Sequence, residues 1–224
     1  MKIAVLSDLH GILPPKDWFE EDCEMLLLAG DILPLKIDQN IELSGEWIYH
    51  TFKPWCLELP FQCIVWIGGN HDFYCERHEE ELLREFGIGK IRYLHNTEFT
   101  YISDLGKEYK IFGTPYCHIY GTWAFMREPE TLENKFSEIP EKLDILLCHD
   151  APFGVSDTVQ FRSEHLGNPE LRKAVLNKQP RYVFHGHLHT SNHSEERLRD
   201  SRIYNTSLVD ESYSPVYKPL YLYL

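Results

Sequence analysis

Carboxylate, imidazole and amide side chains recur in this sequence at one kind of position, directly after short apolar segments. The groups are Ser7-Asp8-Leu9-His10, Gly30-Asp31, Gly69-Asn70-His71-Asp72, His149-Asp150 and His185-Gly186-His187-Leu188-His189. Nitrogen and oxygen donors without thiolate suit Mn, Fe, Zn or similar divalent ions, and they argue against iron–sulfur or thiolate–zinc chemistry. The pattern therefore predicts a metal site of mixed ligands.

The donors are numerous enough for two ions. Two residues separated by one position lie on the same side of an extended segment, so both can reach one ion. Such pairs are Asp8 with His10 and His187 with His189. Asp31 has two carboxylate oxygens and can bridge two ions, while Asn70 and His149 add an amide oxygen and a nitrogen. Two ions about 4 Å apart polarise a phosphoryl group and lower the pKa of a bound water, which predicts phosphoryl chemistry.

The apolar segments that precede these groups are typical of buried strands, because each is short and bounded by Gly, Asp or His. They cover residues 3–7, 25–29, 64–67, 145–148 and 182–184. The carboxyl ends of such strands form the edge of an open α/β sheet at which ligands bind. This placement predicts that the polar groups meet at one edge.

Other segments indicate helices and antiparallel strands. We expect helices at 41–50, 76–86 and 169–177, with Gly87 capping the second, and we expect Pro54 to end or kink the continuation of the first. Strands of antiparallel character are expected at 98–102, 109–113, 202–206 and 217–224. The mixture favours an α/β protein with mixed sheets.

Composition narrows the class of protein. The 224 residues show no repeat or linker and are expected to form one domain, 1–224. The net charge of −13 argues against non-specific binding of nucleic acids or anionic membranes. No apolar segment approaches a membrane span, and the N-terminus lacks the pattern of a signal peptide, so we expect a cytoplasmic protein. Six cysteines without C-x-x-C spacing are expected to be free, buried thiols.

Taken together, the groups from Asp8-x-His10 to Gly186-His187-x-His189 resemble the calcineurin-like metallophosphoesterase superfamily across residues 3–189. The resemblance implies a four-layer αββα sandwich with two mixed β-sheets. It implies that His71 protonates the leaving oxygen or steadies the transition state. It also implies two ligand sets, which are Asp8, His10, Asp31 and His189 for one ion and Asp31, Asn70, His149 and His187 for the other.

Two shorter matches narrow the resemblance. Residues 112–116 with 123–125, and residues 204–207, resemble the small metallophosphoesterase-domain family, whose animal members are weak cyclic-nucleotide phosphodiesterases. The Asp-Arg-Gly element of related phosphoprotein phosphatases is absent, because Ile32-Leu33-Pro34 follows Asp31. The missing arginine would have bound the phosphate of a phosphomonoester, so the sequence disfavours a protein phosphatase.

We therefore expect a metal-dependent phosphoric ester hydrolase in which a metal-bridging hydroxide attacks a phosphodiester, with cyclic nucleotides among the candidate substrates. The expected partner is a small, nucleotide-like phosphorylated substrate, with no stable nucleic-acid partner and no membrane. A phosphomonoesterase, a nuclease and a nucleotide-binding protein with little turnover remain as alternatives. The expected cofactors are two divalent metal ions (Mn, Fe, Zn or similar), with manganese as the ion for assays; the oligomeric state stays open.

For each of four further residues, the sequence is consistent with two different roles. Asp72 can orient His71 or cap the following helix, and His185 can support the site or be structural. Tyr116 and Trp123 can stack on a substrate base, or they can belong to a hydrophobic cluster under a long loop. Substrate choice is expected to depend on the irregular segments 114–128 and 150–168.

Overall fold

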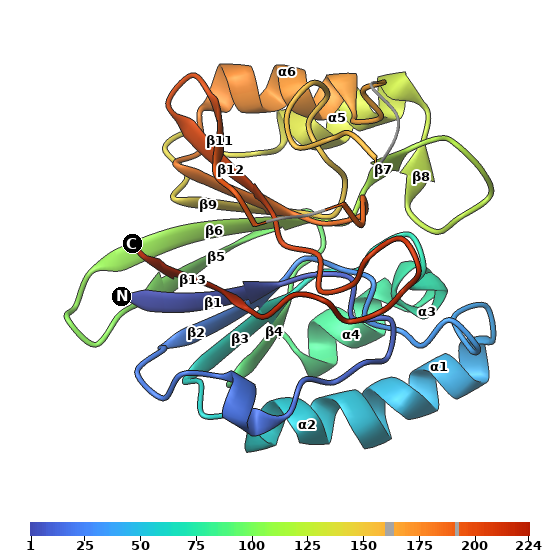
Figure 1. The fold of residues 1–224 in the computed structure, drawn as a ribbon, viewed down its shortest axis with the longest axis vertical. Helices are drawn as coiled ribbons and strands as arrows, with labels where there is room; N and C mark the ends of the chain where they lie inside the picture. The colour runs from blue at the N-terminus through green and yellow to red at the C-terminus, as the bar shows by residue number, and fades with distance from the viewer. Residues whose placement is uncertain (160–163, 191–192) are drawn as a thin grey trace.

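Two β-sheets pack face to face, and helices cover the outer face of each (Figure 1). The structure is a computed structural model that describes residues 1–159, 164–190 and 193–224. Its four layers confirm the expected αββα sandwich with two mixed sheets. Residues 160–163 of the predicted 150–168 segment lie outside the described residues.

The first sheet has the strand order β13-β1-β2-β3-β4. Four strands run parallel, and β13 pairs antiparallel with β1 at the edge. The strand bounds are β1 Lys2–Leu6, β2 Met25–Leu28, β3 Cys63–Trp66, β4 Ile91–Tyr93 and β13 Leu220–Tyr223. Three of these strands end directly before the polar groups at positions 8–10, 31 and 70–72, as predicted.

The second sheet has the order β11-β12-β10-β9-β6-β5, with antiparallel pairs only at its two edges. The strand bounds are β5 Thr97–Ile102, β6 Glu108–Thr114, β9 Ile145–Cys148, β10 Tyr182–His185, β11 Glu196–Leu198 and β12 Ser201–Asn205. The expected antiparallel character of 202–206 is only half right, because β12 pairs parallel with β10 and antiparallel with β11. The segment 114–128 is not wholly irregular, since β7 Cys117–His118 and β8 Met126–Arg127 pair within it.

Helices flank the sheets on both sides (Figure 1). Those on the side of the first sheet are α1 Ile41–Trp47, η2 Ile48–Phe52, α2 Lys53–Glu58, α3 Phe73–Arg77 and α4 Glu79–Glu85, and the short η1 Lys16–Trp18 joins β1 to β2. On the side of the second sheet lie α5 Pro129–Ser137 and α6 Pro169–Lys178. The α6 helix matches its prediction within one residue.

Two expected helices differ in detail from the structure. The helix at 76–86 is broken at His78, whose backbone leaves the helical region while its ring stacks on Tyr74. Gly87 does not cap it, because Phe86 takes the capping position. Pro54 does not end the first helix. The helical backbone runs from α1 through the π turn η2, which directly precedes α2, and then past Pro54 in α2.

Alternate residues of the central strands face two different cores. Ile3 and Val5 of β1 point into the core between the sheets, together with Ile145 and Leu147 of β9. The intervening residues of these strands point toward the helices. Because both faces of the strands are covered, the segments are continuously apolar, and the sheets hold their carboxyl ends in fixed positions.

The described cysteines are all buried and unpaired by disulfides, as predicted. Among the described residues, no helix combines the length and the apolar character that crossing a bilayer requires.

Candidate metal centre

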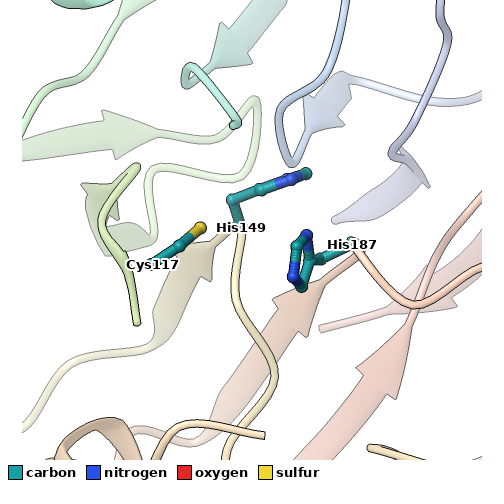
Figure 2. Close-up of side chains that lie close together, drawn as sticks. All are labelled: Cys117, His149 and His187. Atoms are coloured by element: carbon teal, nitrogen blue, oxygen red, sulfur yellow. The ribbon is translucent and has the colours of Figure 1, made fainter. Parts of the chain in front are cut away.

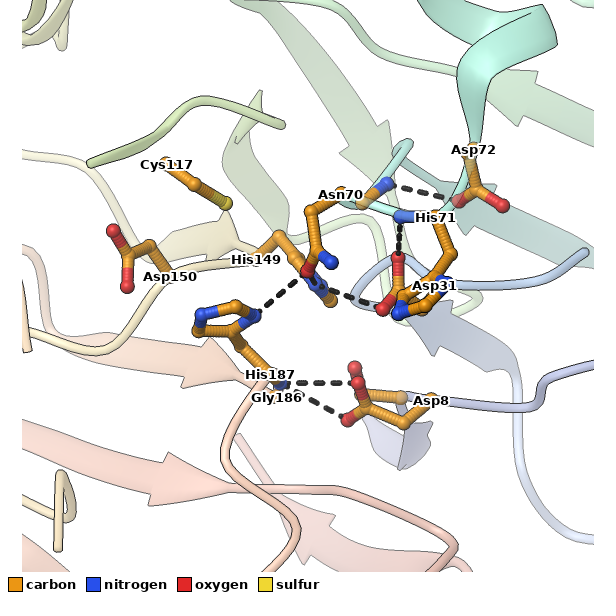
Figure 3. Close-up of polar contacts among 12 residues, drawn as sticks. Asp8, Asp31, Asn70, His71, Asp72, Cys117, His149, Asp150, Gly186 and His187 are labelled. Carbon is orange, nitrogen blue, oxygen red and sulfur yellow. Dashed lines mark hydrogen bonds and ion pairs between the residues drawn. The ribbon is translucent and has the colours of Figure 1, made fainter. Parts of the chain in front are cut away.

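The predicted metal ligands converge at the carboxyl ends of β1, β2, β3, β9 and β10 (Figure 3). Four of them have a left-handed backbone, with φ of 55° at Asp8, 44° at His10, 53° at Asp31 and 71° at His187. This conformation is uncommon outside glycine and costs of order 1–3 kcal/mol per residue. Four such residues among the ligands indicate that the backbone there is held against its local preference, although eight other non-glycine residues of the described chain share this conformation.

The first group of donors consists of Asp8, His10 and His189, whose ligand atoms lie within 4.8 Å of one another. Nε2 of His189 lies 3.4 Å from Oδ1 of Asp8. Nε2 of His10 lies 3.3 Å from Nε2 of His189, so two ring nitrogens face each other. A cation between them satisfies both lone pairs when the two rings are neutral.

The second group surrounds the amide oxygen of Asn70 (Figure 3). Oδ1 of Asn70 lies 2.9 Å from Nε2 of His149 and 2.7 Å from Nδ1 of His187. The other nitrogen of His149, Nδ1, lies 2.8 Å from the carbonyl oxygen of Ala29, which fixes the orientation of the ring. This is the hydrogen-bonding arrangement that holds a ligating histidine in one tautomer.

Asp31 lies between the two groups. Its Oδ2 atom is 3.3 Å from Nε2 of His149 and 3.8 Å from Nε2 of His10, while Oδ1 accepts a hydrogen bond from the backbone N–H of His71 at 2.7 Å. This carboxylate lies close to both donor groups, as a ligand that bridges two ions must.

Glycines let the backbone pass beside these side chains. A Cβ atom at Gly69 would collide with Oδ1 of Asp31, and one at Gly186 would collide with the side chains of Ser7 and Asp8. Both contacts are with atoms that are themselves fixed in the site, so no side chain fits at either glycine.

Burial and charge act in opposite directions on the pKa values here. Burial lowers the pKa of His10 and that of His187 to about 4, which keeps both rings neutral at pH 7. Burial is the largest single influence on Asp31 and favours its protonation, but the charges of the surrounding histidines and the hydrogen bond with His149 together outweigh it and hold the pKa of Asp31 well below its ordinary value. The neutral imidazoles of His10 and His187 beside buried carboxylates fit divalent cations, both by charge and by ligand type.

Sequence reasoning missed a thiol in the second group (Figure 2). The ligand atoms of Cys117, His149 and His187 lie within 4.8 Å of one another. Burial raises the pKa of Cys117 well above its ordinary value, so the side chain is a neutral thiol. The signal for it was absent from the sequence, because Cys117 does not follow one of the ligand-bearing strands.

His71 is oriented by Asp38, which sequence reasoning also missed. Nδ1 of His71 lies 2.7 Å from Oδ2 of Asp38, so this nitrogen donates and Nε2 is left to face a substrate. The ring of Trp123 lies 4.4 Å from that of His71, between centroids, which places Trp123 at the site.

Asp72 fits neither of its two readings. Its carboxylate accepts hydrogen bonds from the backbone N–H groups of Ile32, Leu33 and Gly69, and it makes no capping bond to α3. Burial, followed by the charge of Asp31, raises the pKa of Asp72 to about 7. Its role is to tie the loop after β2 to the loop after β3.

The other two residues lie in the protein interior. Tyr116 is buried away from the ligands and its hydroxyl bonds Nε2 of His95 at 3.0 Å, which supports the hydrophobic-cluster reading. His185 is fully buried at the end of β10, with Nδ1 3.1 Å from the carbonyl oxygen of Gly186.

A cavity of about 260 Å³ opens over the ligands. Two tyrosines line it, of which Tyr120 lies in the segment 114–128 that was expected to govern substrate choice, whereas Tyr213 was not expected at the site. Tyr120 lies 5.2 Å from His187, and Tyr213 lies 4.9 Å from His10, between ring centroids. Tyr213 comes from the segment between β12 and β13, which folds back over the site.

Comparisons with known proteins agree with this geometry. The family model for calcineurin-like phosphoesterases matches residues 1–191. Metallophosphoesterase domain-containing protein 1 of Homo sapiens is 24% identical over 242 residues, covering 98% of this chain and 69% of the relative. A UPF0046 protein of Caenorhabditis elegans is 28% identical over 237 residues, covering 98% and 79%. The crystal structure of TT1561 of Thermus thermophilus superposes with a TM-score of 0.61 at 15% identity, covering 93% of this chain and 89% of that chain.

The chain belongs to the calcineurin-like phosphoesterase family. Membership makes it a metal-dependent phosphoester hydrolase, and the solved structure supports the fold.

Proposed function

We propose that this phosphoesterase cleaves phosphodiesters with two divalent ions bound at the carboxyl edge of its sheets. The observation that carries the proposal is the convergence of two donor groups on the Asp31 carboxylate. In this proposal one ion is held by Asp8, His10, Asp31 and His189, and the other by Asp31, Asn70, His149 and His187. The chemistry that such ions supply is polarisation of the phosphoryl oxygens and acidification of a water.

The residues around the ions position the substrate and handle a proton. Asp38 accepts from Nδ1 of His71, so that Nε2 of the protonated ring can donate its proton to the leaving oxygen. Trp123 and Tyr120 present aromatic surfaces along the cavity, and these suit the base of a small nucleotide-like substrate.

The lining of the cavity favours a diester over a monoester. Among the described residues, no arginine or lysine lines it, whereas the carboxylate of Glu211 does. A phosphomonoester carries up to two negative charges at neutral pH and needs more positive partners than a diester, which carries one. We propose that the substrates are small, because a chain of net charge −13 repels nucleic acids. We also propose that the protein is cytoplasmic.

The test of the two-ion assignment replaces single ligands. Asn70→Ala and His149→Ala should each lower turnover by orders of magnitude and lower the manganese content, while the circular dichroism spectrum keeps its wild-type shape. His50→Ala, at an exposed histidine on η2, is the matched control and should leave turnover unchanged. Wild-type turnover by either ligand variant at matched metal content would remove the assignment.

The test of substrate class compares bis(4-nitrophenyl) phosphate with 4-nitrophenyl phosphate in manganese. We expect faster turnover of the diester, and cyclic nucleotides are then the next substrates to assay. Preference for the monoester would replace this proposal with a phosphomonoesterase.

A further inference from the structure

A second cavity, of about 500 Å³, adjoins the metal centre. It shares Tyr120, His187 and Leu188 with the cavity over the ligands. Its other polar side chains are two imidazoles, His118 and His165. Neither histidine belongs to the donor groups of the metal centre.

His118 is held by a buried carboxylate. Oδ2 of Asp150 accepts from Nδ1 of His118 at 2.8 Å and from its backbone N–H at 2.9 Å. The same oxygen accepts from Nδ2 of Asn168 at 2.9 Å, so Asp150 is fixed in turn.

His165 repeats this arrangement from another segment. Its Nδ1 atom lies 2.6 Å from Oδ1 of Asp157, whose side chain is fully buried. Oδ2 of Asp157 accepts from the backbone N–H groups of Gly154 and Gly167 at 2.7 and 2.9 Å. Both rings therefore have Nδ1 engaged by an immobile carboxylate, and in both the remaining donor position is Nε2.

We propose that this cavity binds a second anionic group, a phosphate or carboxylate, of the substrate whose phosphodiester lies at the metal centre. This inference rests on the proposed function, and it specifies the substrate class as phosphodiesters that carry a second anionic group. When protonated, each ring donates Nε2–H to the anion while its Nδ1–H stays bonded to a buried aspartate.

The charge around the cavity supports an anion. Among the described residues, no carboxylate lines it, although acidic residues outnumber basic ones by 35 to 22 in the whole chain. Leu166, Leu188 and Tyr120 supply apolar walls beside the two imidazoles.

The shared wall links the two cavities into one substrate site. Tyr120 contacts the rings of both His118, at 5.8 Å between centroids, and His187, at 5.2 Å. A substrate that spans this tyrosine places one phosphoryl group at the ions and its second anion between the two histidines.

The experiment measures binding of alkanediol bisphosphates, from ethanediol to hexanediol, and of the matching monophosphates to manganese-loaded protein by titration calorimetry. We expect at least one bisphosphate to bind about tenfold more tightly than its monophosphate. In the His118→Gln/His165→Gln double variant, this ratio should fall toward one, since each monophosphate reports the metal centre alone. His50→Gln is the matched control and should retain the wild-type ratio.

Two outcomes would overturn the subsite. One is equal affinity of the wild-type protein for every matched pair, including no binding of either member. The other is a bisphosphate preference that survives the double substitution. Failure of the proposed function is detected separately, as absent hydrolysis of bis(4-nitrophenyl) phosphate, because the calorimetric ratio requires no turnover.

Discussion

At the scale of single residues, the orientation of His71 depends on a partner far away in the sequence. Asp38 is buried and lies 2.7 Å from Nδ1 of His71, although 33 residues separate the two. An aspartate can only accept here, so it holds a proton on Nδ1, and the proton that the ring takes up and transfers is the one on Nε2. Asp38 is thus a positioning residue for the proposed acid.

Replacing Asp38 tests this role. Asp38→Asn should lower kcat roughly 10- to 100-fold with little change in KM, because the ring loses its fixed tautomer and orientation. Steady-state kinetics in manganese measure the effect, and metal analysis should show wild-type occupancy.

A double-mutant cycle separates positioning from general damage. In a His71→Ala background, Asp38→Asn should cost little further turnover, since the group that it orients is gone. Additive losses from the two substitutions would contradict the assigned role.

At the scale of elements, the N-terminus of α6 is connected to the network beside the metal centre. The Oδ1 atom of Asn168 accepts from the backbone N–H of Leu171 at 3.0 Å and caps the helix. Its Nδ2 atom donates to Asp150, next to the proposed ligand His149. Asn40 caps α1 through the same bond to Leu43, at 3.1 Å.

The two caps form a matched pair for measurement. Asn40→Ala should lower the free energy of unfolding by about 1 kcal/mol, the usual value of a cap. Asn168→Ala should cost about 2–3 kcal/mol, because it also leaves a buried carboxylate oxygen with one donor fewer. Urea unfolding followed by circular dichroism gives both values, and equal losses would show that the bond to Asp150 adds nothing.

At the scale of the whole molecule, buried neutral histidines make stability depend on pH. His95 follows β4 and packs between the rings of Tyr93, Tyr116 and Phe125. Burial lowers its pKa from 6.5 to about 4. The unfolded chain therefore binds a proton at pH values where the folded chain does not.

The sign of the effect follows from this difference. The stabilisation from the neutral ring of His95 is complete above pH 6.5 and decreases as the pH falls toward 4. At pH 4 the loss in the free energy of unfolding amounts to about 3 kcal/mol. Between pH 7.5 and 5, wild-type protein should lose about 2 kcal/mol more than His95→Gln. Urea unfolding of both proteins without metal tests this, and parallel pH profiles would contradict it.

The strands and the composition of the site were predictable from the amino-acid sequence alone. Short segments apolar at every position are typical of strands covered on both faces, and the donors directly after them lie at the carboxyl ends of those strands. Asp8, Asp31 and His149 could therefore be assigned to one site, although only the structure shows that the first two follow strands of one sheet and His149 a strand of the other. The α5 helix was missed, although Pro129 at its start and the buried pair Leu132 and Phe136 carry a helical pattern.

The side chains that surround those donors became known only from the folded chain. Asp38, Cys117 and Tyr213 follow none of the ligand-bearing strands, so no local pattern marks them. Asp72 lies in a ligand motif, yet it binds backbone groups of two loops that only the pairing of β2 with β3 brings together. Contacts between segments distant in sequence depend on sheet order and loop path, and periodicity within one segment carries no information about either.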